Sequence, residues 1–245
     1  MNKYIKTFSR QGFTLVELLT VIAIIGILAT IIIPGVFKAQ EKAEKAKAQS
    51  NARQIAMAYN TYAMEGRNIR KGNAFRTKTN PREATDIYDW AGVLANAGGL
   101  DDPSIWYIEV DNAAPLEYPN TVLAPGTGDR GVDPDFTGTT LAWSVVYGMP
   151  KSAPAAKTPL LWTRGLGTDG FWVEKAIGEG ESDKSVWGEE GGHVAFLDAH
   201  VEWKSSMVED NDEGDLTNIR TNRPTKNFND AIGASSTSIG VFDPE

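Results

Sequence analysis

Twenty consecutive residues near the start of the chain, Leu18 to Phe37, carry no formal charge and are mostly apolar. As an α-helix at a rise of about 1.5 Å per residue, they would extend about 30 Å, which is the thickness of the hydrocarbon core of a bilayer. The sequence therefore predicts one membrane-spanning helix. Residues 38–245 are enough to form a sizeable soluble domain beside it.

A carboxylate, Glu17, stands at the start of this apolar stretch. An isolated charge in hydrocarbon is costly, so Glu17 requires a partner or a purpose. A secretory signal peptide has a shorter apolar region, with its cleavage site on the far side. Here a small residue, Gly12, lies on the near side, after a short segment that contains Lys3, Lys6 and Arg10. Cleavage after Gly12 would leave the apolar helix on the mature protein.

This arrangement resembles the leader of type IV prepilins and of the pseudopilins of type II secretion. The matching features are the short basic leader that ends in Gly12, the residues from Phe13 to Glu17, and an apolar helix that contains Pro34. The resemblance implies that a prepilin peptidase cleaves between Gly12 and Phe13 and methylates the new Phe13 amine. It also implies that Glu17, unpaired in the monomer, pairs with the Phe13 amine of a neighbouring subunit. The alternative is a plain anchor whose Glu17 reaches the lipid–water interface.

The resemblance divides the chain into a leader peptide (1–12), a transmembrane and filament-core helix (13–37) and a soluble pilin-like head (38–245). Helix-forming residues continue after Pro34, and no further proline occurs before Gly66. One helix is therefore expected from Phe13 to about Glu65, with a kink or local melting at Pro34. Its second half carries an apolar stripe at spacings of three and four residues, namely Ala48, Ala52, Ile55, Tyr59 and Tyr62.

The rest of the head predicts one more helix and several strands. The helix is expected to begin with Asn80 as N-cap and Pro81 as its first residue, and to end at Gly98–Gly99. Residues 66–80 and 111–138 predict loops, and the acidic tail from Ser205 onward predicts a partly mobile segment. Strands are expected over residues 139–148, 159–164, 170–173, 193–197 and 201–204. Together these elements predict an α+β fold with an antiparallel sheet.

The segment GGHVAFLDAHVEW, residues 191–203, predicts a hairpin with a tight turn at Asp198–Ala199. It is similar to the carboxy-terminal signature of a pilin-like family abundant in planctomycetes, in which a His precedes a strand that ends in an Asp-Gly turn. His193 and Asp198 are the matching positions. Ala199 stands where that family has Gly, and Ala disfavours the positive φ of such a turn.

Two groups of residues are candidates for binding or catalysis. His193, Asp198 and His200 include both histidines of the chain, but a catalytic zinc site usually needs three protein ligands, so a structural role is favoured. A membrane-anchored enzyme with its site around His193 and Asp198 stays an alternative. Oxygen ligands gather at Asp210, Asp212 and Asp215, and the resemblance to major pseudopilins raises the case for calcium there. A solvated acidic loop is the simpler interpretation.

Two other patterns have a structural interpretation. A G-x-G-x-x-G pattern at Gly165, Gly167 and Gly170 precedes an expected strand rather than a helix, which predicts an inter-strand loop rather than a nucleotide site. Seven tryptophans could form a sugar-binding platform, as in an adhesin or a ligand-binding minor subunit. Most of them fall on expected strands or on a helix face, so a core role is favoured.

Charge and composition narrow the function. The chain has 24 basic and 32 acidic residues; removal of the leader with its three basic residues leaves 21 and 32, a net charge of −11, which should repel nucleic acid. The absence of cysteine excludes disulfides and thiol nucleophiles. The sequence thus predicts a structural filament subunit rather than an enzyme. The expected partners are further copies or related pilins, the prepilin peptidase, the inner-membrane assembly machinery and the membrane. The expected location is the inner membrane with a periplasmic head, then a surface or extracellular filament.

Overall fold

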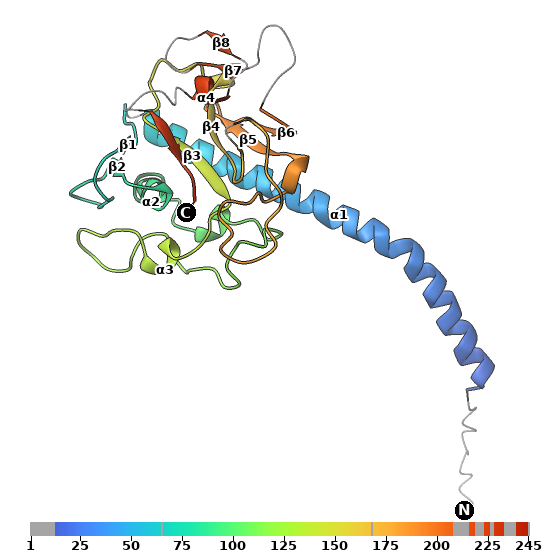
Figure 1. Ribbon diagram of the computed structural model, residues 1–245. Helices are drawn as coiled ribbons and strands as arrows, with labels where there is room; N and C mark the ends of the chain where they lie inside the picture. The colour runs from blue at the N-terminus through green and yellow to red at the C-terminus, as the bar shows by residue number, and fades with distance from the viewer. Residues whose placement is uncertain are drawn as a thin grey trace, which may run out of the picture. The chain divides into compact units, whose positions relative to one another are not determined.

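The computed structural model describes residues 13–64, 66–167, 169–207, 216–218, 223–225, 228–232 and 239–244. The chain separates into two compact units between Ala43 and Glu44. Helix α1 (Leu15–Met64) begins in the first unit and ends in the second. All other helices and strands belong to the second unit, called the head below (Figure 1).

Helix α1 confirms the long helix predicted from the sequence, and it begins within two residues of the expected start. Of the two effects expected at Pro34, local melting is wrong, because the helix continues through this residue without a break, and the kink stays a prediction. Proline removes one backbone donor from the ladder, and the uninterrupted turns on both sides keep the remaining hydrogen bonds of a 50-residue helix.

A five-stranded antiparallel sheet forms the centre of the head, in the order β6-β5-β4-β3-β9. Four of its strands overlap predicted segments and confirm the α+β fold: β3 (Trp143–Tyr147), β4 (Pro159–Thr163), β5 (Gly192–Phe196) and β6 (Val201–Lys204). The fifth, β9 (Gly240–Phe242), comes from the polar tail, where no strand was expected, and pairs with β3.

The strand expected at residues 170–173 is wrong. This segment makes only single bridges, Leu166 with Trp172 and Phe171 with Ser206. Trp172 of this segment is buried in the core instead, and its indole donates a hydrogen bond to the Thr163 carbonyl at 3.1 Å.

The second helix, α2 (Ile87–Gly98), begins later than predicted. Its N-cap is Asp86, whose carboxylate accepts a hydrogen bond from the Asp89 amide, and not Asn80. Asn80 instead closes a turn by donating its amide to the Arg76 carbonyl. The next residues form β2 (Glu83–Ala84), which pairs in parallel with β1 (Arg70–Lys71). The predicted helix end is confirmed, since Gly99 is a left-handed C-cap with φ 70°.

Short elements complete the described head. They are the 3₁₀ turns η1 (Pro103–Trp106), η2 (Ala155–Lys157) and η3 (Gly188–Glu190), the helices α3 (Pro134–Thr137) and α4 (Phe228–Ala231), and the strands β7 (Leu216–Thr217) and β8 (Pro224–Thr225).

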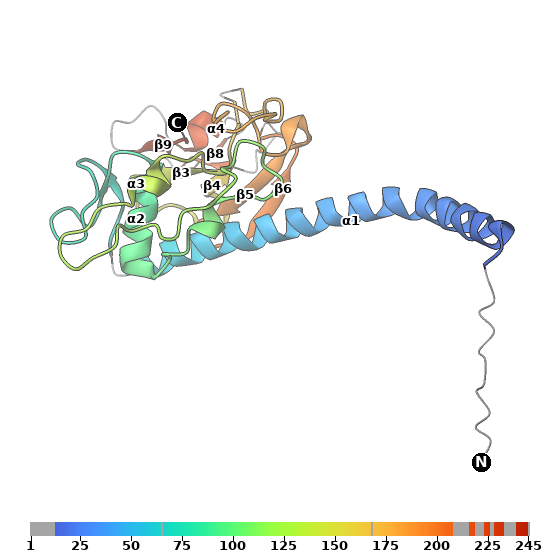
Figure 2. The same cartoon turned by 90° about the horizontal axis from the view of Figure 1, so that it is seen from below.

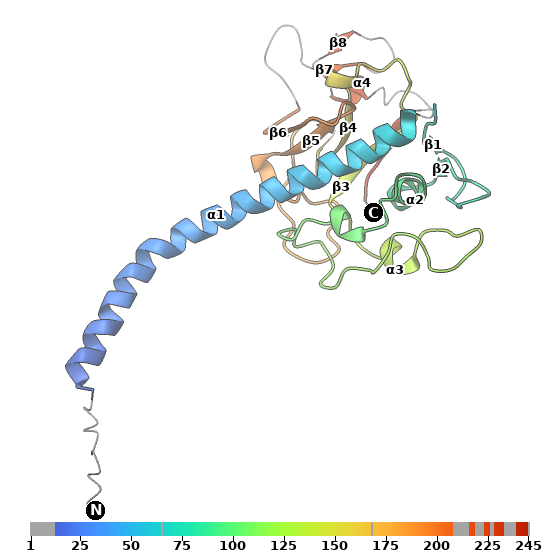
Figure 3. The same cartoon turned by 180° about the vertical axis from the view of Figure 1, so that it is seen from behind.

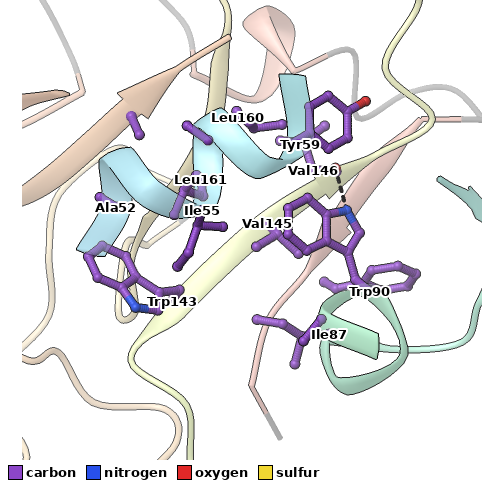
Figure 4. Packing of buried hydrophobic residues seen from close by; sticks show 14 of the residues in the cluster. Ala52, Ile55, Tyr59, Ile87, Trp90, Trp143, Val145, Val146, Leu160 and Leu161 are labelled. Carbon is purple, nitrogen blue, oxygen red and sulfur yellow. Dashed lines mark hydrogen bonds between the residues drawn. The ribbon is translucent and has the colours of Figure 1, made fainter. Parts of the chain in front are cut away.

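The core lies between the second half of α1, the sheet and α2. The predicted stripe of α1 is buried along its whole length, from Ala48 to Tyr62. Figure 3 shows this part of α1 running across the sheet. In Figure 4, Tyr59 of α1 stacks on Trp90 of α2 with ring centroids 5.7 Å apart, and the Trp90 indole donates to the Val146 carbonyl at 3.2 Å. Six of the seven tryptophans are buried, which confirms their predicted core role, while Trp203 is 37% exposed.

The hairpin of β5 and β6 confirms the predicted turn. The strands pair antiparallel, with His193 opposite Trp203 and Ala195 opposite Val201. Ala199 takes a positive φ of 66°, which no other non-glycine residue of the described segments does. Its amide donates to the Phe196 carbonyl at 2.8 Å, and this closes the turn. The hairpin lies beside α1 (Figure 2).

Candidate functional site

The first half of α1 presents an apolar surface that is exposed among the described residues. Every Leu, Ile, Val and Phe from Phe13 to Phe37 is at least 45% exposed. Of the described helices, α1 is long and apolar enough to cross a membrane by length and composition. A helix that is apolar on all sides needs lipid or neighbouring helices around it.

The start of α1 is fixed by a reciprocal pair of side chains, Thr14 and Glu17. The Glu17 amide donates to the Thr14 hydroxyl at 3.2 Å, while the Glu17 carboxylate oxygen Oε2 accepts from the Thr14 amide at 2.9 Å and from the Thr14 hydroxyl at 2.7 Å. This is a capping box, in which the N-cap residue and the third helical residue each satisfy a backbone donor that the helix leaves open.

The capping box changes the description of Glu17. Thr14 hydrogen-bonds the Glu17 carboxylate within a single chain, but it carries no charge, so the pairing of the Glu17 charge with a neighbouring subunit's amine stays a prediction. Both of these hydrogen bonds reach Oε2, and among the described residues Oε1 accepts none. Threonine at position 14 followed by glutamate at position 17 is the sequence signal for this box.

The structure describes some of the other residues of the predicted processing and assembly site. Phe13 lies directly before the capping box and is 78% exposed. Pro34 lies inside α1, three residues before Phe37 at the end of the apolar stretch. Gly12 is outside the described residues. So are Asp210, Asp212 and Asp215, and calcium binding there stays a prediction.

The structure does not bring His193 and His200 into one site. His193 lies on β5 opposite Trp203 of β6, whereas His200 lies at the turn, where its ring stacks on Phe196 and hydrogen-bonds Asp198. The described segments contain no cluster of three or more His, Asp or Glu residues able to hold a metal ion. The hairpin therefore separates the residues of the alternative metal or enzyme site.

His193 instead belongs to an aromatic cluster that contacts α1. Its ring makes edge contacts with Trp203 at 4.9 Å and with Trp187 at 6.0 Å. The Lys45 ammonium lies 4.3 Å from the Trp203 ring centroid and forms an ion pair with Glu190 at 3.0 Å. Burial and the nearby Lys45 charge lower the pKa of His193 to about 4, so the imidazole is neutral at pH 7.

The glycine pattern at residues 165–170 is a loop, as predicted. The Gly167 amide donates to the Phe171 carbonyl at 2.7 Å and the Gly170 amide donates to the Gly167 carbonyl at 3.0 Å, which closes the turn on itself. No helix follows it, so its amides are not arranged to receive a pyrophosphate.

A buried ion pair next to this loop was not predicted. Arg164, at the end of β4, donates to both carboxylate oxygens of Asp111, and its side chain is 1% exposed. Asp111 lies in a segment that the sequence identifies only as loop. Nothing in the sequence marks this pair, because the two residues are 53 positions apart.

Comparisons with known proteins find one family model and several relatives that match part of the chain. The family model described as the prokaryotic N-terminal methylation motif matches residues 7–33. Type II secretion system core protein G of Escherichia coli is 39% identical over 59 residues, which are 24% of this chain and 41% of that protein. Type IV major pilin protein PilA of Myxococcus xanthus is 42% identical over 55 residues, which are 22% of this chain and 25% of that protein. No solved structure matches.

One relative matches a longer part of the chain. Type II secretion system core protein G of Pseudomonas aeruginosa is 34% identical over 122 residues, which are 48% of this chain and 76% of that protein. The match of the methylation motif covers Phe13 and the capping box, and the long helix with an antiparallel sheet gives the α+β fold that the prepilin-like sequence predicts. On this similarity, the chain belongs to the family of type IV pilins and type II secretion pseudopilins.

Proposed function

We propose that this protein is a structural subunit of a pilus or pseudopilus, assembled through the first half of α1. The observation that carries this proposal is the apolar surface from Phe13 to Phe37, which is exposed among the described residues. Such a surface needs lipid before assembly and the helices of neighbouring subunits afterwards. The names of the relatives, a secretion-system core protein and a major pilin, support the same role.

In this proposal, a prepilin peptidase removes residues 1–12 and methylates the Phe13 amine. Residues 13–37 then hold the subunit in the inner membrane, with the head in the periplasm, until the assembly machinery extracts it. The new amine of one subunit meets the Glu17 carboxylate of another. The open Oε1 of Glu17 supports this step, because the carboxylate can accept a cation while Oε2 keeps its hydrogen bonds to Thr14.

The filament interior gives this contact its strength. An ion pair in a medium of low dielectric is stronger than the same pair in water, and a misplaced subunit would leave both charges unpaired. The pairing of Glu17 with a neighbour's amine would therefore set the axial register between subunits. The subunit needs no catalytic activity of its own for this role.

The direct test is electron microscopy of material sheared from the surface of cells that express the full chain, combined with mass spectrometry of the filaments. We expect filaments that contain this protein. Filaments that lack it, in cells whose membranes contain it, would contradict the proposal.

A further inference from the structure

We propose that the heads of successive copies bind head to tail, with an apolar knob of one head in a basic-rimmed cleft of the next. This inference rests on the proposed filament function and names the partner surface of the head. The knob is formed by Leu116 and Ile177 with Glu117 and Glu179. The cleft lies at the end of α1 and has Arg67 and Lys151 at its rim.

The knob is an exposed apolar surface on two loops that are fixed to each other. Leu116 is 94% exposed and Ile177 is 86% exposed. Two hydrogen bonds join their loops, from the Asn112 side chain to the Ala176 carbonyl at 2.8 Å and from the Gly180 amide to the Ala113 carbonyl at 3.1 Å. Large aliphatic side chains held this far out of the core by an ordered framework are typical of interaction surfaces.

The loop that carries Leu116 is anchored on both sides. Before it, the buried pair of Asp111 and Arg164 fixes the chain. After it, Tyr118 stacks on Tyr107 with ring centroids 4.6 Å apart and an interplanar angle of 8°. The knob is therefore presented in a fixed position, which lowers the entropy cost of binding.

The cleft offers a matching surface. It encloses about 490 Å³ and is lined by apolar atoms of Tyr59, Ala63, Met64 and Met149. This volume lies within the range of roughly 300–1,000 Å³ found for ligand pockets, so aliphatic side chains such as those of the knob can enter it. Met64 at its rim is 87% exposed.

Charge distinguishes the two surfaces. Glu117 and Glu179, beside the apolar residues of the knob, are exposed, and among the described residues neither forms an ion pair. Arg67 and the exposed Lys151 line the cleft, together with Asp198, which is engaged by His200. The segment that follows, residues 66–82, contains six basic residues and no acidic one. The acidic knob and the basic cleft are complementary, which favours this one pairing over contacts between like surfaces.

The two surfaces lie toward opposite ends of the head, and their separation is estimated along α1. The side of the head that carries the knob contacts α1 near the residue where the head begins, because Lys47 forms an ion pair with Glu109 at 2.9 Å. The cleft is lined by the end of the helix, including Ala63. At about 1.5 Å per residue, the 16 residues from Lys47 to Ala63 correspond to about 24 Å. Contact between two different surfaces is heterologous, and its repetition produces an open filament when the rotation between copies does not close a ring.

Cysteine cross-linking of the full chain tests the contact, and the natural absence of cysteine leaves a clean background. One copy carries Ile177→Cys and a co-expressed, differently tagged copy carries Met64→Cys. We expect a mixed disulfide dimer under mild oxidation only when both variants are present. Gln54→Cys, on an exposed part of α1 outside the cleft, is the matched control and should give no dimer with Ile177→Cys.

A charge exchange adds a second readout. Lys151→Glu should lower the yield of the cross-linked dimer by roughly fivefold, and Glu179→Lys in the knob-bearing copy should restore it. Lack of the Ile177–Met64 dimer, or a dimer equally strong with Gln54→Cys, overturns the contact. Filament formation is scored separately on cysteine-free protein. Filaments without the specific dimer leave the proposed function standing and reject this inference, whereas the dimer without filaments does the reverse.

Discussion

Arg164 and Asp111 form a buried pair in which two parallel hydrogen bonds, of 2.9 and 2.8 Å, join the guanidinium to the carboxylate. The same guanidinium donates to the carbonyls of Leu141 and Lys184, each at 2.8 Å. One side chain thereby connects the end of β4 to three separate segments of the head. The guanidinium and the carboxylate are thus both hydrogen-bonded. The pair fixes the loop that carries Leu116 and the acidic segment near residue 184.

We expect Asp111→Asn and Arg164→Met to destabilise the head strongly. Removal of one partner leaves the other buried and uncompensated, at a cost of about 3–5 kcal/mol. Denaturant unfolding of the full chain in detergent, followed by tryptophan fluorescence, measures this loss. Lys184→Met is the control, since it breaks the partly exposed pair with Glu174 and should lower the unfolding free energy far less than either change at the buried pair. A loss of stability in Lys184→Met as large as that in Asp111→Asn or Arg164→Met would contradict the structural role of the buried pair.

His193 should make the stability depend on pH between about 6.5 and 4. Its pKa is lowered from 6.5 to about 4 in the folded protein, so within this window the unfolded chain binds the proton more readily. Stability should therefore fall as the pH falls through the window, by an amount on the order of 3 kcal/mol for this group. The measurement is the unfolding free energy at several pH values.

Carboxylates also titrate in this window, so the histidine effect is isolated by comparison of variants. His193→Phe keeps an aromatic ring beside Trp203 and removes the titrating group, and the pH dependence should become shallower. An unchanged slope in His193→Phe would show that burial of this ring does not govern the acid response.

Ala199→Gly should stabilise the hairpin. Ala199 has a φ of 66°, where a side chain carries a steric cost of roughly 1–2 kcal/mol that glycine avoids. The gain should appear as a higher unfolding midpoint. Ala46→Gly, at an exposed position of α1, is the same change in ordinary helical backbone and should instead cost roughly 0.5–1 kcal/mol. A loss of stability in both variants would contradict the strained turn.

Glu17 can be tested for charge and for capping separately. Glu17→Gln can still accept the hydrogen bonds of Thr14 but has no charge, so the protein should enter the membrane and fail to assemble. Thr14→Ala keeps the charge and removes the hydroxyl of the capping box, so it should assemble better than Glu17→Gln. The measurement compares membrane-bound and sheared-filament protein for each variant. Normal filament yield from Glu17→Gln would favour the plain-anchor interpretation.

Processing gives an independent prediction. Protein recovered from filaments should begin at Phe13 and carry a methyl group on its amine, because the motif match spans residues 7–33 and includes this junction. Intact-mass spectrometry and amino-terminal sequencing measure both features. Gly12→Leu should block cleavage and leave the full-length chain in the membrane. Mature protein that retains Met1 would reject the assignment.

Local patterns in the sequence were enough to predict the long helix, its buried stripe from Ala48 to Tyr62 and the hairpin that follows His193. Each of these depends on side-chain periodicity or on a turn between neighbouring segments. The same reasoning failed for α2, where Asn80 and Pro81 form a plausible cap but the chain pairs β2 with β1 first. A local signal cannot show that a distant strand competes for the same residues.

The sequence by itself determined that an apolar helix with Glu17 at its start precedes a head that contains several strands of an antiparallel sheet. It also placed threonine three residues before that glutamate, so the capping box is a local property. Only the tertiary structure decided that Arg164 pairs with Asp111, that His193 lies among tryptophans rather than beside His200, and that β9 completes the sheet. These contacts join residues far apart in the chain, and their energy depends on burial, which no single segment can provide.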